Sequence, residues 1–296
     1  MDIKIWLKKY HLIIVYAVTI PLIMAFSSIY EKDVYRLYNQ DGEIVSYSEL
    51  LHLALESEIT FFGELHNSAI AHWLQYELVR DAAEDASASL MIGMEMFERD
   101  QQILIDEYFA GKISQNSFEN EARLWNNYKT DYKPIVEFAK SNGIALIATN
   151  IPRRYASAVY SGGLEVLDSL STEAKKWIAP LPVEVDVELP GYKNILEAAH
   201  GHGGANLIYS QAIKDATMAH SILSTMEEGS RFIHVNGSYH SNNYEGIIWY
   251  INREKDDLKI LTINTITVDD VNRVDREKLQ ASDITLVVSS RMTTTF

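Results

Sequence analysis

The sequence predicts an α/β fold: a mainly parallel β-sheet flanked by helices, with a small helical insert. Short apolar runs alternate along the chain with longer stretches of helical spacing, which is the pattern of strand–helix–strand units. The runs are mostly apolar throughout, as in strands that are buried on both faces. A chain of 296 residues that is 47% hydrophobic and 23% charged can bury one large core of this kind.

Six runs are predicted to be strands because they are short and rich in aliphatic, β-branched or aromatic residues. They span residues 59–63, 90–97, 144–149, 232–236, 260–266 and 284–288. Apolar residues spaced by three and four predict helices over 70–78, 103–109, 135–139 and 211–226. Asn142-Gly143 is a typical helix stop directly before the third strand.

The segment 155–210 interrupts this alternation. It holds Gly162-Gly163, several prolines and a Gly-His-Gly-Gly run at 201–204, and it contains no convincing strand. We predict a helical insert or lid over the sheet edge. A long irregular loop is the alternative, because it gives a similar pattern.

Residues 1–27 differ from the rest of the sequence. Lys4, Lys8 and Lys9 precede an uncharged apolar run over 12–26, which is the pattern of a secretory signal peptide. The run is shorter than the roughly 20 residues of a typical membrane span. An uncleaved membrane anchor over residues 5–26 is one alternative, and a buried core helix is another. We therefore expect an exported protein of the periplasm or cell envelope, with its α/β domain over residues 45–296.

Charge and cysteine content exclude some classes of protein and site. The net charge of −15 argues against nucleic-acid binding, which needs a basic surface. The sequence has no cysteine. It therefore has no disulfide, no thiolate zinc site and no lipid-attachment cysteine.

Polar residues occur at the carboxyl ends of four predicted strands. Glu64 and His66 follow the first strand, Glu95 lies in the second, Arg153 follows the third and His240 follows the fourth. In a parallel sheet these ends share one edge, the edge at which such folds bind ligands. The sequence therefore predicts that these five side chains converge on one pocket.

The two carboxylates also have structural interpretations. Glu64 can cap a helix that starts near Ser68. Glu95 interrupts an apolar run, where an unpaired carboxylate is costly, so a buried ion pair with Arg153 or Arg154 is the alternative to a role in a pocket.

The histidines differ in their sequence context. His66 and His240 each close a Gly-x-x-His pattern after a strand, and this repetition favours a functional role for both. His234 lies within the fourth strand and is predicted to be a core histidine. The remaining histidines outside the insert, His72 among them, are predicted to be structural or exposed.

A second cluster of candidate ligands lies in the predicted insert. His200 and His202 sit among glycines, with Tyr192 and Tyr209 nearby. Glycines around imidazoles suit a loop that closes on a ligand, and His and Tyr are both ligands of haem iron. A flexible surface loop is the alternative.

Several ordered blocks of sequence resemble the ChaN-like haem-binding uptake family of the Tiki superfamily, which is related to TraB/PrgY proteins and erythromycin esterases. The blocks are Gly63-Glu-Leu-His-Asn67, Glu95-Met-Phe-Glu-Arg-Asp-Gln-Gln102, Trp125 with Tyr132-Lys-Pro-Ile, Ala148-Thr-Asn-Ile-Pro-Arg153, Gln211–Ala219 and Asn236-Gly-Ser-Tyr-His240. They follow the family's order over roughly residues 58 to 250.

The resemblance implies an exported α/β protein that binds haem, serves in iron acquisition and dimerises around the cofactor. It also implies a superfamily pocket built from Glu64, His66, Glu95, Arg153 and His240. The missing cysteine departs from relatives that are lipoproteins. Membrane attachment therefore depends on the N-terminal segment.

Under the first functional hypothesis the protein binds haem for uptake. The candidate iron ligands are then Tyr192, His200, His202 and Tyr209, and Arg153 or Arg154 binds the propionates.

Under the second hypothesis the protein is a hydrolase. His66, His240, Glu64 and Glu95 then hold a divalent metal such as Mn, Co or Zn that activates water, or His66 acts directly as a general base. Arg153 stabilises developing negative charge. The third possibility is a binding scaffold in which these residues form a structural network.

Overall fold

The structure is a computed structural model that describes residues 32–296. The chain divides into two units, Met1–Val34 and Tyr35–Phe296, and the fold described here is that of the second unit. The signal peptide or anchor predicted over residues 1–27 lies outside the described residues. Within residues 32–296, no helix has the length and apolar character needed to span a membrane.

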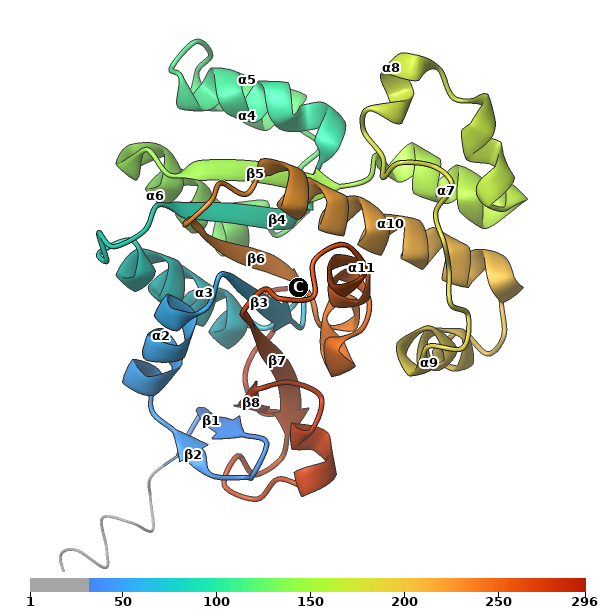
Figure 1. Ribbon diagram of the computed structural model, residues 1–296. Helices are drawn as coiled ribbons and strands as arrows, with labels where there is room; N and C mark the ends of the chain where they lie inside the picture. Colours follow the sequence, from blue (N-terminus) through green and yellow to red (C-terminus); the bar gives the residue numbers. More distant parts are fainter. Residues whose placement is uncertain (1–31) are drawn as a thin grey trace, which may run out of the picture. The chain divides into compact units, whose positions relative to one another are not determined.

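An eight-stranded sheet in the order β2-β1-β8-β7-β3-β6-β4-β5 runs through this unit (Figure 1). The strands are β1 (Tyr35–Asn39), β2 (Ile44–Val45), β3 (Ile59–Glu64), β4 (Leu90–Glu98), β5 (Ala145–Asn150), β6 (Arg231–Gly237), β7 (Ile260–Val268) and β8 (Ile284–Ser289). Strands β3 to β8 pair in parallel, whereas β1 is antiparallel to both β2 and β8. The predicted fold class is confirmed, and so are all six predicted strands.

The helices are α2 (Tyr47–Glu56), α3 (Ala69–Ala82), α4 (Gln102–Phe109), α5 (Gln115–Glu121), α6 (Lys133–Asn142), α7 (Arg153–Gly162), α8 (Thr172–Lys175), α9 (Pro190–Ala198), α10 (Gly204–Thr225) and α11 (Ile247–Glu254). Short helical turns are η1 (Arg99–Gln101), η2 (Tyr128–Tyr132), η3 (Leu164–Ser169), η4 (Ser238–His240), η5 (Asn242–Tyr244) and η6 (Arg276–Leu279). The predicted stop after Asn142 is present, since Gly143 adopts the left-handed conformation at the end of α6.

Helices cover both faces of the sheet. One face packs against α2 to α6, with Phe62 and Ile92 of the strands buried against Leu74 and Ile135. The other face packs against α10 and α11. Because both faces are covered, β3 is buried at every residue, which explains why its sequence shows no alternation.

Residues 155–210 contain helices and turns but no strand: most of α7, then η3, α8, α9 and the start of α10. Ile151, Val159 and Ile178 pack with Ile213 of α10 in one apolar cluster. A smaller cluster beneath α9 centres on Tyr192.

The strand order places three carboxyl ends side by side. β6 lies between β3 and β4, so that Glu64 is level with Gly237 and both lie near Glu95. Alternation along the strands sends Glu64 toward the α3–α6 face and Glu95 toward α10. Any group that reaches both carboxylates must therefore cross the sheet edge.

Candidate functional site

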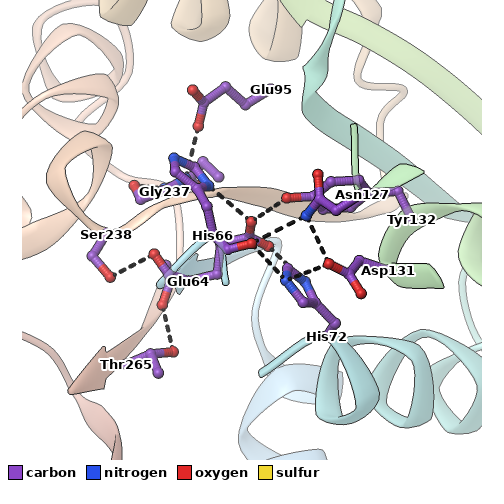
Figure 2. A network of polar contacts seen from close by, with 12 residues as sticks. Glu64, His66, His72, Glu95, Asn127, Asp131, Tyr132, Gly237, Ser238 and Thr265 are labelled. Atoms are coloured by element: carbon purple, nitrogen blue, oxygen red, sulfur yellow. Dashed lines mark hydrogen bonds and ion pairs between the residues drawn. The ribbon is translucent and has the colours of Figure 1, made fainter. Parts of the chain in front are cut away.

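Glu64 ends β3 and is buried, and its carboxylate accepts several hydrogen bonds (Figure 2). Oε1 accepts from Tyr132 Oη at 2.6 Å and faces His66 Nδ1 at 2.9 Å, while Oε2 accepts from Gln75 Nε2 at 2.7 Å. Burial raises the pKa of Glu64, but hydrogen bonds from His66, His72 and Tyr132 outweigh burial and hold the pKa below its usual range. The carboxylate is therefore ionised and rigidly placed.

His66 follows Glu64 by two residues and crosses the sheet edge. Its Nδ1–H points at Glu64, so the neutral ring carries its lone pair on Nε2. The side chain is 41% exposed, and the ring of Trp125 meets it edge-on at 5.0 Å. Burial lowers the pKa of His66, but the bond to Glu64 and the charge of Glu95 raise it above its usual value.

Gly237 gives the imidazole of His66 room to lie against β6. A Cβ atom at Gly237 would be 2.7 Å from His66 Cε1 and 2.8 Å from His66 Nε2, closer than such atoms approach. The Gly237 N–H donates to Glu95 Oε2 at 2.7 Å. Gly237 thus leaves room for the His66 imidazole and donates a hydrogen bond to the Glu95 carboxylate.

Glu95 begins a buried polar chain on the α10 side of the edge. Its Oε1 lies 3.2 Å from His240 Nε2, and His240 Nδ1 contacts Asp215 Oδ1. Tyr192 Oη then donates to Asp215 Oδ2 at 2.9 Å. Burial lowers the pKa of His240, but the charges of Glu95 and Asp215 outweigh it and raise the pKa to about 10. His240 is therefore an imidazolium at neutral pH.

The backbone of His66 is also held in place. Its carbonyl accepts from His72 Nε2 and from Asn127 Nδ2, both at 3.1 Å, and Asn127 also donates to Asp131 Oδ2 at 2.7 Å. Figure 2 shows Asn127, Asp131 and His72 gathered beside His66, on the side opposite Ser238. His72 was predicted to be structural or exposed, and it is a buried part of this network. Ser68, not Glu64, caps α3, by accepting from Ala71 N.

The four residues proposed as metal ligands do not form a ligand set. Both carboxylate oxygens of Glu64 already accept hydrogen bonds from protein groups. Of the Glu95 oxygens, Oε2 accepts from Gly237 N–H and Oε1 contacts His240. His240 has each ring nitrogen directed at a carboxylate. No three histidine or acidic side chains among residues 32–296 are arranged to hold a metal. The donor set therefore does not fit Mn, Co or Zn.

Neither predicted arginine bonds the strand-end side chains Glu64, His66, Glu95 or His240. Arg153 is exposed at the start of α7 and makes no hydrogen bond or ion pair with the rest of the described chain. Arg154 is paired with Asp100 and stacks on Tyr155 and Trp177. Glu95, whose predicted structural partner was one of these arginines, is instead paired with His240.

The candidate iron ligands occupy different environments. His200 and His202 are exposed in the turn between α9 and α10, where Gly201 and Gly203 adopt positive φ angles. Tyr209 is half-buried on α10. Tyr192 is buried, and its hydroxyl donates a hydrogen bond to Asp215.

Four residues that hold the strand-end side chains in place were not predicted from the sequence: Gln75, Asn127, Asp131 and Asp215. They lie on helices and turns, so their position relative to a strand end gives no signal. For Asp215 the available signal was its place in the block Gln211–Ala219 that resembles the family, whereas the other three lie outside the blocks.

His234 agrees with its prediction as a core histidine. It is fully buried, with Nε2 2.9 Å from Thr149 Oγ1 and Nδ1 2.9 Å from Asn236 Oδ1. Burial lowers the pKa of His234 to about 4. It is therefore a neutral ring within the sheet.

The fold and site define an α/β protein with a histidine–carboxylate cluster at the carboxyl edge of its sheet. The model of the family described as "Haem-binding uptake, Tiki superfamily, ChaN" matches residues 50–251. The chain belongs to this family, and the resemblance stated from the sequence is confirmed.

Solved structures share the fold. The ChaN protein of Campylobacter jejuni, whose structure shows cofacial haem binding, matches with a TM-score of 0.66 and 19% identity, covering 87% of this chain and 98% of that one. A Bacillus cereus protein matches with a TM-score of 0.51 and 10% identity, covering 86% and 95%. An erythromycin esterase mutant reaches a TM-score of only 0.47 at 11% identity, covering 79% and 77%. No curated protein matches the sequence.

Proposed function

We propose that this protein binds haem and serves in haem or iron uptake. Family membership supports haem as the ligand, and the exposed imidazoles of His200 and His202 carry the assignment within this chain. Imidazole and phenolate are both axial ligands of haem iron, so His200, His202 and the nearby Tyr209 fit the group chemically. Tyr192 fits poorly, because its hydroxyl is buried and bonded to Asp215.

The surface beside this turn also suits a flat ligand. Tyr160 is 44% exposed, and its ring lies 2.7 Å from where a Cβ of Gly203 would stand. Arg153 precedes Tyr160 by seven residues on α7, hence on the same helix face and roughly 10 Å away along the axis. Arg153 can hold a propionate there, with Arg154 as the alternative.

A haemin titration tests the proposal. The wild-type chain is expected to shift the Soret band, and a His200→Ala/His202→Ala variant is expected to bind at least about tenfold more weakly. His52→Ala is the matched control, because His52 is exposed on α2 away from the insert. Absence of a Soret shift for the wild-type chain at micromolar concentration would contradict haem binding.

Export and dimerisation belong to the same proposal. Residues 1–27 supply the export signal, with an N-terminal membrane anchor as the alternative form of attachment. The cofacial haem binding of the Campylobacter jejuni protein supports a dimer around the cofactor. Analytical ultracentrifugation with and without haemin tests this, and a mass that haemin leaves unchanged contradicts haem-mediated pairing.

The second candidate function is a hydrolase with His66 as general base. One observation favours it: a partly exposed imidazole whose Nδ1 is fixed by the buried Glu64 and whose Nε2 makes no hydrogen bond with the described residues. The protein is then expected to hydrolyse a chromogenic ester such as 4-nitrophenyl acetate, and His66→Ala to lose that activity. Hydrolysis that His66→Ala leaves unchanged would exclude this mechanism.

A further inference from the structure

Residues 292–296 lie against the loop that carries His66. After β8, Met292 N donates to Ser289 O at 3.0 Å, and the chain then reverses direction. Thr294 pairs antiparallel with Ser68, and Thr295 N donates to Asn67 O at 3.1 Å. The end of the chain is accordingly marked beside β3 in Figure 1.

This loop joins β3 to α3 and determines where His66 stands. On its inner side the His66 carbonyl is held by His72 and Asn127. On the side facing residues 292–296, the main chain of the two residues after His66 is held by Thr294 and Thr295. The loop is therefore clamped from two directions, and only the inner clamp belongs to the helices around the pocket.

We propose that residues 292–296 form a strap that positions the loop carrying His66. The strap is anchored at Met292, which packs against the main core. Beyond that anchor it binds through main-chain pairing, which fixes the loop without requiring particular side chains. The strap is thus a positioning element for His66 that lies outside the region matched by the family model.

The strap is also weakly held. Thr295 Oγ1 is buried without a hydrogen-bond partner among the described residues, an arrangement that opposes docking. Phe296 is 69% exposed and buries little apolar surface. Segments with few buried contacts open at low free energy. The strap therefore opens before the rest of the fold and frees the His66 loop when it does.

Chemical modification of histidines by diethylpyrocarbonate, followed by mass spectrometry, tests the strap. Thr295→Pro removes the N–H that Asn67 accepts, and a chain ending at Arg291 removes the strap. Both are expected to raise the modification rate of His66 by roughly two- to tenfold, the value of one hydrogen bond. Thr293→Ala is the matched control, because it changes an exposed side chain of the strap and leaves the main chain intact, and it should leave the rate unchanged.

His234 gives an internal reference in the same digest, since it is fully buried in the sheet and reacts only when the fold loosens. An increase confined to His66 supports the strap. Equal rates at His66 in all variants overturn the proposal, and so does an increase shared by His234, because that outcome means general loosening. The measurement needs neither haem nor substrate, so its outcome is independent of both proposed functions.

Discussion

Two buried tyrosines of η2, Tyr128 and Tyr132, differ in whether the hydroxyl has a partner. Tyr132 donates to Glu64 at 2.6 Å, whereas the Tyr128 hydroxyl has no partner among the described residues. Hydrogen bonds to charged groups are worth about 1.5–3 kcal/mol, while an unpaired buried hydroxyl is a cost. Tyr132→Phe should therefore lower the free energy of unfolding by about 1.5–3 kcal/mol, and Tyr128→Phe should leave it unchanged or raise it.

Urea unfolding of the two variants against wild type measures this difference. The substitution removes the same oxygen from the same residue type in the same turn, so the pair controls for lost volume. Equal stability changes in the two variants would show that the bond to Glu64 contributes nothing beyond packing.

Gly237 is the residue whose missing side chain gives the His66 imidazole room to lie against β6. In Gly237→Ala the new methyl must displace the imidazole ring, because the nearest ring atoms lie 2.7 and 2.8 Å from it. Overpacking of this kind costs about 1–3 kcal/mol of stability. The His66 ring resonances in NMR should shift at the same time.

A double-mutant cycle separates this clash from other effects of the added methyl. Combining Gly237→Ala with His66→Ala removes the ring that the methyl meets, so most of the lost stability should return. Additive losses would place the strain elsewhere than at His66.

At the scale of elements, β5 forms one edge of the sheet and is protected by a side chain of α4. Gln102 Oε1 accepts from Ala148 N at 2.6 Å, and Gln102 Nε2 donates to Leu146 O at 2.9 Å. The amide thus makes the two bonds that a neighbouring strand would make, and exposed strand edges promote association.

Gln102→Ala should therefore lower the free energy of unfolding by about 1–3 kcal/mol and promote self-association. Gln115→Ala on α5 is the matched control, since Gln115 is exposed and bonds only Glu119 within the described chain. Unfolding midpoints and light scattering at increasing protein concentration measure the two effects. A Gln102→Ala variant that resembles the control in both would contradict the edge-protecting role.

The sequence revealed the six mostly apolar strands, β3 to β8, but not the two short strands at one side of the sheet, β1 and β2. β3 to β8 are mostly apolar runs because helices cover both faces of the sheet. β1 and β2 escaped prediction because they are short and partly exposed, with Ile44 58% exposed, so neither forms an apolar run.

The same limit applies to the site. Glu64, His66, Glu95 and His240 could be found because a strand end brings a polar residue to a known edge. Asp215 lies in the middle of α10, 25 residues before the histidine that it contacts. The spacing of residues along a helix cannot show that contact, because the contact depends on where α10 crosses the sheet. Arg153 shows the reverse case: it follows a strand end in sequence, yet α7 carries it outward to solvent.

For the whole molecule, two buried histidines make stability depend on pH in opposite directions. His240 lies between Glu95 and Asp215, which raises its folded pKa to about 10 from an ordinary value of 6.5. Its contribution to stability is therefore complete below pH 6.5 and is lost as the pH rises toward 10. His234 has a folded pKa lowered to about 4, so its contribution is complete above pH 6.5 and is lost as the pH falls toward 4.

Stability should consequently peak near pH 6.5 and decline on both sides. Each of the two groups changes the free energy of unfolding by up to about 1.4 kcal/mol per pH unit within its window. His240→Gln should flatten the decline in the free energy of unfolding between pH 7 and 10, because Gln has no proton to lose in that range. The acid side should be unchanged. Urea unfolding across pH 4 to 10 gives both slopes. An alkaline slope that persists in His240→Gln would mean that groups other than the imidazolium between Glu95 and Asp215 control stability there.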